Sequence, residues 1–388
     1  MDFEFSPDQM QLRDAVLDLC SQFDGQYWLR KDRDGGFPEE FYRAIADAGW
    51  LGIAMPEEYG GAGLGITEAA LMLQAIAESG GGMSATSSVH MNIFGLNPVV
   101  VFGSDEQKRR ALPPLIRGEG KACFAVTEPD AGLNTTKLTT RAVRTGNRYV
   151  VNGRKIWIST AQVADHMLLL ARTTPIEEVK RPTDGLSLFY TKLDRDYIDV
   201  REIDKMGRKA VDSNELFIDG LPIPMEDRIG EEGKGFQYVL HGMNPERILV
   251  SAEAIGIGRS ALARATQYAK ERVVFDRPIG MNQGIQHPLA QCWADLEAAH
   301  LMTFRAASLY DRDEPCGSQA NAAKLLSAEA AVKTCEVAIL THGGFGYAKE
   351  YHVERYLREA MILRIAPVSP HLILCNIAEK VLGLPKSY

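Results

Sequence analysis

Residues 149–157 read YVVNGRKIW and contain two β-prone runs on either side of Asn152-Gly153. An Asn-Gly pair between such runs predicts a β-hairpin. Three further runs are predicted to be short strands, and only turn residues separate them: 166–171, 186–191 and 215–218. Short strands without long helical patterns between them predict a small antiparallel barrel or sandwich. We therefore expect a middle β domain over residues 121–232.

The chain on both sides of this region has helical character. At the N-terminal end, Ser6-Pro7-Asp8-Gln9 combines a capping serine, a proline at the first helical position and a glutamine three residues after the cap. Toward the C-terminus, four Ala-rich stretches predict a helical bundle: 247–271, 283–310, 318–341 and 370–382. The expected fold class is mainly α with a middle antiparallel β domain. The expected domains are 1–120, 121–232 and 233–388.

Composition excludes several classes of function. The 388 residues include 43 basic and 51 acidic side chains, a net charge of −8, without the basic surplus that a general nucleic-acid binder carries. Apolar runs are far shorter than a membrane span requires. The N-terminal MDFEF carries Asp2 and Glu4 where a targeting segment has positive charge. The six cysteines form no CxxC pair, which argues against zinc or disulfides and favours a cytoplasmic location.

None of the eight histidines forms a metal-spaced pair, so we expect no metal site and interpret each histidine as an ordinary core or surface residue. Two segments have possible ligand-binding character. The stretch 124–132, FAVTEPDAG, brings a β-prone run into a Pro/Gly turn, and Thr341–Tyr347 ends a predicted helix with three glycines. From the residues alone, an ordinary loop is the favoured interpretation of the first segment, and a glycine helix stop explains the second at least as well as a ligand contact does.

Five stretches in order carry a family resemblance: GIAMPEEYGGAG (52–63), FAVTEPDAGLNTTKL (124–138), YVVNGRKIWISTAQVADHMLLLART (149–173), ERVVFDRPIGMNQGIQHPLAQ (271–291) and GGFGYAKEYHVERYLREAMI (343–362). Over nearly its whole length the chain resembles the acyl-CoA dehydrogenase family. The resemblance implies a helical N-terminal domain, a middle β domain and a C-terminal four-helix bundle. It also implies FAD, a homotetramer, and electron-transfer flavoprotein as the electron acceptor.

The implied reaction is the α,β-dehydrogenation of an acyl-CoA. A carboxylate removes the α proton while the β hydride passes to the flavin, and hydrogen-bond donors stabilise the thioester oxygen.

The resemblance also assigns site residues by motif. Those implied to contact the flavin from the middle region are Phe124, Val126, Thr127, Gly132, Leu133, Trp157 and Ser159. Those implied to reach the flavin of a neighbouring subunit are Arg272, Phe275 and Gln283. Gly343 and Gly344 are implied at the FAD pyrophosphate, and Ser369 belongs to the same cofactor set. Arg247, together with Leu133, is implied near the thioester and CoA. Without the resemblance, Trp157 fits a core residue and Arg272 a solvated helix-end charge.

Three positions depart from the family pattern. Leu133 stands where the family usually has serine, and Leu340 where it usually has glutamine. Pro367 stands where most members have the catalytic glutamate, so that position has neither a carboxylate nor a backbone N–H. The resemblance implies that this N–H is one of the donors to the thioester oxygen, and removing one such donor costs about 3 kcal/mol of transition-state stabilisation. A shift of one residue would place Ala366 there and restore the donor without restoring the base.

Glu246 is the expected replacement base. It directly precedes Arg247, at the position where isovaleryl-CoA dehydrogenase and related members carry their glutamate. The alternative is an ordinary acid in the first turn of a helix, stabilised by the helix dipole. Glu350 and Glu354 belong to the ordinary EYxxER pattern of the family and are not assigned as bases.

Three functions follow as hypotheses. The first is an FAD-dependent acyl-CoA dehydrogenase that forms a trans-2-enoyl-CoA with Glu246 as base. The second is an enoyl-CoA reductase-type or other flavin reaction on a CoA thioester, since crotonobetainyl-CoA reductase-like members also lack the usual glutamate. The third is a non-catalytic FAD-binding member of the family.

Overall fold

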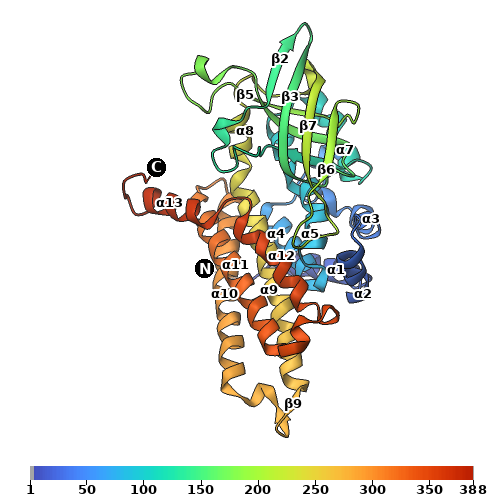
Figure 1. Cartoon of the computed structure of the whole chain (residues 1–388), viewed down its shortest axis with the longest axis vertical. Helices are drawn as coiled ribbons and strands as arrows, with labels where there is room; N and C mark the ends of the chain where they lie inside the picture. Colours follow the sequence, from blue (N-terminus) through green and yellow to red (C-terminus); the bar gives the residue numbers. More distant parts are fainter. Residues whose placement is uncertain (1–3, 388) are drawn as a thin grey trace.

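The computed structural model describes residues 4–387, apart from the side chain of Phe94, so Asp2 of the N-terminal motif lies outside the described part. Figure 1 shows a β-sheet at one end of an elongated molecule, a helical region beside the centre and a long helical bundle at the other end. The N-terminal helices are α1 Pro7–Cys20, α2 Gly25–Asp34, α3 Glu39–Asp47, α4 Ile66–Ile76, α5 Gly82–His90, α6 Asn97–Phe102 and α7 Asp105–Ile116.

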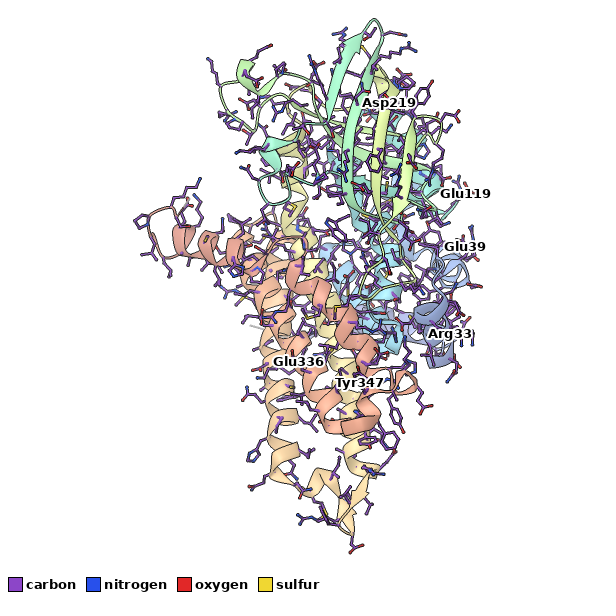
Figure 2. The ribbon with its side chains drawn as sticks, viewed as in Figure 1. Arg33, Glu39, Glu119, Asp219, Glu336 and Tyr347 are labelled. Carbon is purple, nitrogen blue, oxygen red and sulfur yellow. The ribbon has the colours of Figure 1, made fainter. Side chains whose placement is uncertain are left out.

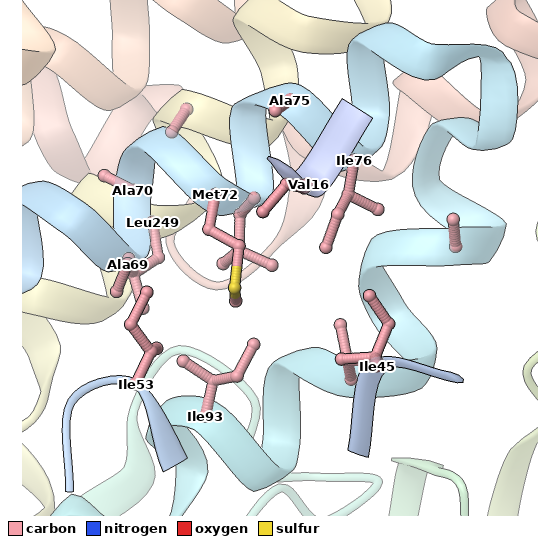
Figure 3. Close-up of a cluster of buried hydrophobic side chains, with 14 of the residues drawn as sticks. Val16, Ile45, Ile53, Ala69, Ala70, Met72, Ala75, Ile76, Ile93 and Leu249 are labelled. Atoms are coloured by element: carbon pink, nitrogen blue, oxygen red, sulfur yellow. The ribbon is translucent and has the colours of Figure 1, made fainter. Parts of the chain in front are cut away.

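The predicted start of the first helix is confirmed. The backbone N–H of Gln9 donates to the Ser6 hydroxyl over 3.2 Å, and the Gln9 amide oxygen accepts from the Ser6 N–H over 3.0 Å. These two bonds form a capping box. Buried side chains of α1, α3 and α4 then pack together, as Val16, Ile45 and Ile76 show in Figure 3.

This core also includes Leu249 of α9 (Met243–Glu271), which is fully buried. Leu249 lies three residues after Glu246 and so belongs to the next helical turn. Burying a leucine side chain contributes about 1.5–3 kcal/mol. The packing of the N-terminal helices therefore fixes the first turns of α9, where the candidate base lies.

The middle region forms one sheet of eight strands in the order β6-β7-β3-β2-β4-β5-β8, with β1 paired to β4. The strands are β1 Ala122–Ala125, β2 Arg141–Thr145, β3 Arg148–Ser159, β4 His166–Arg172, β5 Leu186–Lys192, β6 Ile198–Glu202, β7 Ser213–Pro224 and β8 Arg228–Ile229. The expected middle β region is thus present. The sheet is mixed rather than purely antiparallel, because β4 pairs in parallel with both β1 and β2.

The predicted hairpin at Asn152-Gly153 is wrong. The strand β3 runs straight through this pair with a register shift against β7, and the turn lies earlier, at Gly146-Asn147 between β2 and β3. Gly153 serves close packing instead, because a Cβ atom there would come within 2.4 Å of the Thr140 hydroxyl. Glycine inside a strand commonly marks such a bulge.

The C-terminal region consists of α8 Gly235–His241, α9, the small hairpin β9 Val273–Val274 and β10 Arg277–Pro278, α10 Gln283–Asp311, α11 Gly317–His342, α12 Val353–Ile365 and α13 Pro370–Lys380. The bundle consists of α9, α10, α11 and α12. We expected 370–382 to be its fourth member, but α13 projects away from the bundle (Figure 1) and contacts α11, whose Asn321 donates to Asn376 over 2.8 Å. Most of the side chains of α13 are exposed or half-buried, and only Ile373 is buried.

Among residues 4–387, no single helix combines the length and apolar character needed to cross a membrane. Only α12 and α13 taken together reach that length and composition, as a pair bent by 40°.

Candidate active site

A buried ion pair joins the two middle-region segments that carry predicted flavin contacts. The Lys155 ammonium donates to Oε1 of Glu128 over 2.9 Å, and also to the carbonyls of Val126 and Leu170 over 3.0 and 2.8 Å. Lys155 is fully buried on β3, and Glu128 lies in the turn after β1. A backbone bond from Ile156 N–H to the Thr127 carbonyl, 3.0 Å long, holds the same two segments together.

The environment of Glu128 stabilises its charged form. Burial opposes ionisation, but the Lys155 charge and hydrogen bonds from Thr139 and Thr140 outweigh it and lower the pKa of Glu128 to about 2. Burial lowers the pKa of Lys155 to about 8, against the attraction of Glu128. The pair therefore sets the relative position of Val126 and Thr127 on one side and Trp157 on the other.

Trp157 lies near the end of β3 in an unusual conformation. Its φ is +63°, a region that β-branched and bulky residues rarely adopt, and 57% of its surface is exposed. An exposed indole beside a structured loop offers a flat apolar surface to a ligand. Phe124 is half-buried on β1, whereas Gly132 and Leu133 lie on the exposed turn that follows.

Arg208 connects Ser159 to the N-terminal helices. Its guanidinium donates to the hydroxyls of Ser87 over 3.1 Å, Ser159 over 3.1 Å and Ser213 over 3.2 Å. Because Arg208 occupies an acceptor site of the Ser159 oxygen, the Ser159 hydroxyl keeps its own proton as a donor. The planar fork of arginine suits this three-way contact.

The candidate base Glu246 lies in the first turn of α9 and binds a histidine. His90 at the end of α5 donates from Nε2 to Oε2 of Glu246 over 2.8 Å. The other ring nitrogen, Nδ1, donates to Oε1 of Glu253 over 2.7 Å. Burial disfavours the imidazolium, but Coulombic attraction to Glu246 and Glu253 outweighs it and raises the pKa of His90 well above its usual range. We therefore treat both ring nitrogens as protonated donors.

The helix α5 links Glu246 to the sheet side of the site. Ser87 and His90 are three residues apart on α5 and so share one face of the helix. Ser87 contacts Arg208, which contacts Ser159, while His90 contacts Glu246. The structure thus brings the candidate base and the Ser159 side of the sheet to the same helix.

Arg247 connects the same turn of α9 to the C-terminal helices. It donates to Asn244 over 2.8 Å and to Asn321 of α11 over 3.0 Å, while its buried Nε has no hydrogen-bond partner among the described residues. Burial lowers the pKa of Arg247. One turn further along α11, Lys324 donates over 2.7 Å to the carbonyl of Val368.

That lysine contact anchors the loop after α12, where Pro367 stands. The Ala366 N–H donates to the Ile362 carbonyl over 2.9 Å, so it is bound within α12 and is not a free donor. Ser369 caps α13, since its hydroxyl accepts from the Leu372 N–H over 3.4 Å. The loop thus lies near Arg247 through α11, but it offers neither a carboxylate nor the Ala366 donor.

A second group of predicted residues lies at the other end of the molecule. Arg272, Phe275 and Gln283 lie at or beside the β9–β10 hairpin, at the tip of the bundle farthest from the sheet (Figure 1). Gly343 and Gly344 follow α11, close to Tyr347, which Figure 2 labels on the lower bundle, far from Asp219 on the sheet. Within one chain, this group therefore does not meet the middle-region group.

The features of this bundle end favour contact with another molecule. Phe275 is 93% exposed, and the Arg272 guanidinium lies 5.7 Å from the centre of the Phe345 ring. A Cβ atom added at Gly343 or Gly344 would meet no atom within 4 Å, so the backbone there is open to close approach. Leu340 is also strongly exposed.

The sequence reasoning missed five residues of the site: His90, Glu253, Arg208, Glu128 and Lys155. One signal for the first two was present. Glu253 interrupts an apolar stretch of α9 seven residues after Glu246, which places both carboxylates on one face of the helix. His90 is a buried, fully hydrogen-bonded histidine, as the sequence reasoning expected, but its contacts with two carboxylates were not foreseen. In residues 4–387, no cluster of ligands suited to a metal ion is present.

Three family models match the chain in sequence. The model for the N-terminal domain of acyl-CoA dehydrogenase matches residues 6–119, that for the middle domain matches 123–221, and that for the C-terminal domain matches 233–368.

Among curated relatives, the acyl-CoA dehydrogenase FadE12 of Mycobacterium tuberculosis is 35% identical over 99% of this chain and 98% of its own. The 3-(aryl)acrylate reductase of Clostridium sporogenes is 34% identical over 86% of this chain and 88% of its own. Subunit CarC of the caffeyl-CoA reductase–Etf complex of Acetobacterium woodii is 32% identical over 86% and 87%.

Solved structures share the same architecture. Butyryl-CoA dehydrogenase from Megasphaera elsdenii superposes with a TM-score of 0.93 at 28% identity, over 98% of this chain and 100% of the other. The FAD complex of PigA superposes with a TM-score of 0.93 at 27% identity, over 99% of this chain and 100% of the other.

Proposed function

The chain belongs to the acyl-CoA dehydrogenase family of FAD-binding oxidoreductases that act on CH–CH donors, and we propose on this premise that it oxidises a saturated acyl-CoA to the trans-2-enoyl-CoA with Glu246 as the base. The observation that supports this most is the placement of Glu246. Its carboxylate is ordered by His90 and linked through α5 to Ser159, whereas the loop that carries Pro367 has no carboxylate.

The described residues fit FAD. The exposed indole of Trp157, the oriented hydroxyl of Ser159 and the Val126–Thr127 segment form a surface suited to a flat ring that accepts hydrogen bonds. The open backbone at Gly343 and Gly344 suits a pyrophosphate. When bound, FAD supplies the two-electron redox chemistry of the reaction. In this proposal, the remaining cofactor-binding residues of the chain are Phe124, Gly132, Leu133 and Ser369.

The proton step falls to Glu246. Its side chain is 26% exposed, so Glu246 lies between the interior and the open side of the site. A carboxylate in contact with the α carbon accepts its proton as the C–H bond breaks, and this kind of catalysis typically contributes about 10²–10⁴-fold. Arg247, with its unpartnered buried Nε, lies beside it and is proposed to contact the thioester end of the substrate.

A second candidate is the reverse reaction, reduction of an enoyl-CoA. Two observations favour keeping it: two relatives are named as reductases, and Pro367 replaces the usual glutamate. Since a base for the forward reaction is an acid for the reverse one, Glu246 serves either direction.

Anaerobic titration tests these proposals. We would add butyryl-, isobutyryl-, isovaleryl-, octanoyl- and palmitoyl-CoA in turn to the purified holoenzyme and follow flavin absorption. Bleaching by a saturated thioester supports dehydrogenation. No bleaching by any of them, with reoxidation of reduced flavin by crotonyl- or cinnamoyl-CoA, supports the reductase. A holoenzyme whose bound flavin is neither reduced by any saturated thioester nor reoxidised by an enoyl-CoA contradicts both and leaves the non-catalytic FAD-binding member.

The role of Glu246 needs a separate variant. Glu246→Gln keeps the size of the side chain and its hydrogen-bonding capacity but removes the base. We expect it to retain FAD and to lose bleaching by the thioester that reduces the wild type. Unchanged bleaching in this variant would exclude Glu246 as the base while leaving the dehydrogenase assignment intact.

We also propose the partners and assembly. Electron-transfer flavoprotein is the proposed electron acceptor. This proposal is supported by the relative CarC, whose name places it in a complex with Etf. A homotetramer would bring Arg272, Phe275 and Gln283 of one chain to the flavin of another, which fits their exposed position at the bundle tip. A cytoplasmic location stays a prediction, and all six cysteines are free thiols.

A further inference from the structure

Glu246 forms the outer end of a row of three charged side chains. His90 contacts Glu246 through Nε2 over 2.8 Å and Glu253 through Nδ1 over 2.7 Å. The exposed fraction of these side chains falls from 26% for Glu246 to 11% for His90 and 2% for Glu253. The inner end of the row is therefore enclosed by protein, and only the outer end is accessible.

The spacing on α9 makes the row possible. Seven residues along an α-helix correspond to a rise of about 10 Å, nearly two full turns, so Glu246 and Glu253 lie on one face. A single imidazole ring from α5 fits between the two carboxylates and contacts both. The two nitrogens of the ring point in opposite directions, and each contacts a different carboxylate. The His90 ring is therefore held at both sides and cannot rotate without breaking one of the two contacts.

Two positively charged side chains lie near the row. Arg208, on the segment between β6 and β7, interacts electrostatically with Glu253, and Arg247 on α9 interacts with Glu246. Each carboxylate of the row thus has a guanidinium group within electrostatic reach, in addition to the imidazolium between them. Buried charges are tolerated when they are paired in this way.

We propose that His90 is a positioning residue for Glu246 and that Glu253 anchors it. The inference rests on the proposed role of Glu246 as the base. The bond from Nε2 occupies Oε2 and leaves Oε1 as the oxygen that approaches the α carbon. A free glutamate loses side-chain rotamer entropy when it is fixed in one orientation. His90 fixes it before the substrate binds, so the carboxylate is already oriented for proton transfer.

Stopped-flow reduction of the holoenzyme tests this proposal, with the thioester of the panel that bleaches the wild type fastest. The variants are His90→Gln, Glu253→Gln and Glu246→Gln. The matched control is His300→Gln, because His300 on α10 is a half-buried histidine whose ring is hydrogen-bonded to the Gln74 side chain over 3.0 Å rather than to either glutamate. FAD content, melting temperature and exchange of the α hydrogen into D2O are measured for each protein.

We expect the limiting rate of reduction and the α-hydrogen exchange of His90→Gln to fall about 100-fold, a loss of the size that a misplacement of about 1 Å can cause. The half-saturating thioester concentration and the FAD content should stay as in the wild type, since binding does not depend on the orientation of the base. Glu253→Gln should show a smaller loss of the same kind, and His300→Gln none.

The outcomes separate the two proposals. If Glu246→Gln reacts normally, the base assignment fails and the role of His90 fails with it. If Glu246→Gln is inactive while His90→Gln and Glu253→Gln react at the wild-type rate, only the positioning role is overturned. If His90→Gln does not retain FAD, the rate of flavin reduction in Glu253→Gln decides whether the positioning role holds. In the double variant Glu246→Gln/His90→Gln, additive losses would also contradict the proposal, because residues that act as a unit are not additive.

Discussion

Lys155 and Glu128 form a 2.9 Å ion pair inside the sheet region, and this pair fixes the two segments whose neighbours Thr127 and Trp157 belong to the proposed flavin surface. One partner comes from the interior of a long strand and the other from a turn. The position of the site therefore depends on a charge pair that is itself closed to solvent.

Replacing Lys155 by methionine should destabilise the protein strongly. The methionine fills much of the same volume but leaves the Glu128 carboxylate buried without its cation, and breaking a buried pair in this way costs about 3–5 kcal/mol. Denaturant unfolding of the two proteins measures the difference. Lys192→Met is the control, because its pair with Asp194, 3.3 Å long, is largely exposed and should cost less than about 1 kcal/mol. Equal losses in both variants would contradict the prediction.

Stability should also fall in acid because of Glu128. Its pKa in the folded protein is lowered to about 2, so its contribution is complete above the ordinary glutamate value and is lost as the pH falls toward about 2. Thermal unfolding of the wild type and of Glu128→Gln, followed from neutral pH into acid, measures this. The two curves should converge as the pH falls, and a constant gap would show that Glu128 is not responsible.

His90 and His300 should show opposite dependences on pH. The pKa of His90 is raised well above its usual range, so its contribution is complete below the unfolded value and is lost as the pH rises through the folded one. Burial lowers the pKa of His300 to about 4, so its contribution is complete above the unfolded value and is lost as the pH falls toward about 4. The difference in free energy of unfolding between the wild type and His90→Gln should thus narrow as the pH rises. The difference between the wild type and His300→Gln should narrow as the pH falls. Gaps that narrow in the same direction would contradict this assignment.

Arg208→Lys should weaken the link between α5 and the sheet. A lysine ammonium cannot reproduce the arginine fork that reaches Ser87, Ser159 and Ser213, and each hydrogen bond to a charged group contributes about 1.5–3 kcal/mol. We expect a lower melting temperature and an altered visible spectrum of the bound flavin. Arg201→Lys, on an exposed side chain paired with Asp199, serves as the control and should change neither.

Phe275→Ser tests the contact across subunits. Because Phe275 is 93% exposed within one chain, its replacement should change the stability of that chain by no more than about 0.5 kcal/mol. If it reaches the flavin of a neighbouring subunit, FAD content and the oligomeric state measured by light scattering should both fall. Tyr197→Ser, at an exposed position on the middle region, is the control. A tetramer with full FAD content in Phe275→Ser would exclude this contact.

Much of the architecture followed from local sequence. The Ser6–Gln9 capping box, the positions of β4, β5 and β7, and the long helices α9, α10 and α11 agree with prediction, because caps and hydrophobic periodicity act over a few residues. The hairpin at Asn152-Gly153 was wrong for the opposite reason. There, the turn propensity of Asn-Gly lost to pairing with β7 and to the close approach of Thr140, both of which are long-range contacts.

The sequence by itself determined the three-part order of the chain, the motifs of the family and the absence of a glutamate at Pro367. Only the tertiary structure decided how Glu246 is held, since His90 lies 156 residues away in the chain and Glu253 two helical turns further along α9. Only the tertiary structure also separated the bundle-tip residues from the sheet. The reason is physical: a short motif reports local backbone preferences, whereas the partner of a buried charge is chosen by which helices pack together.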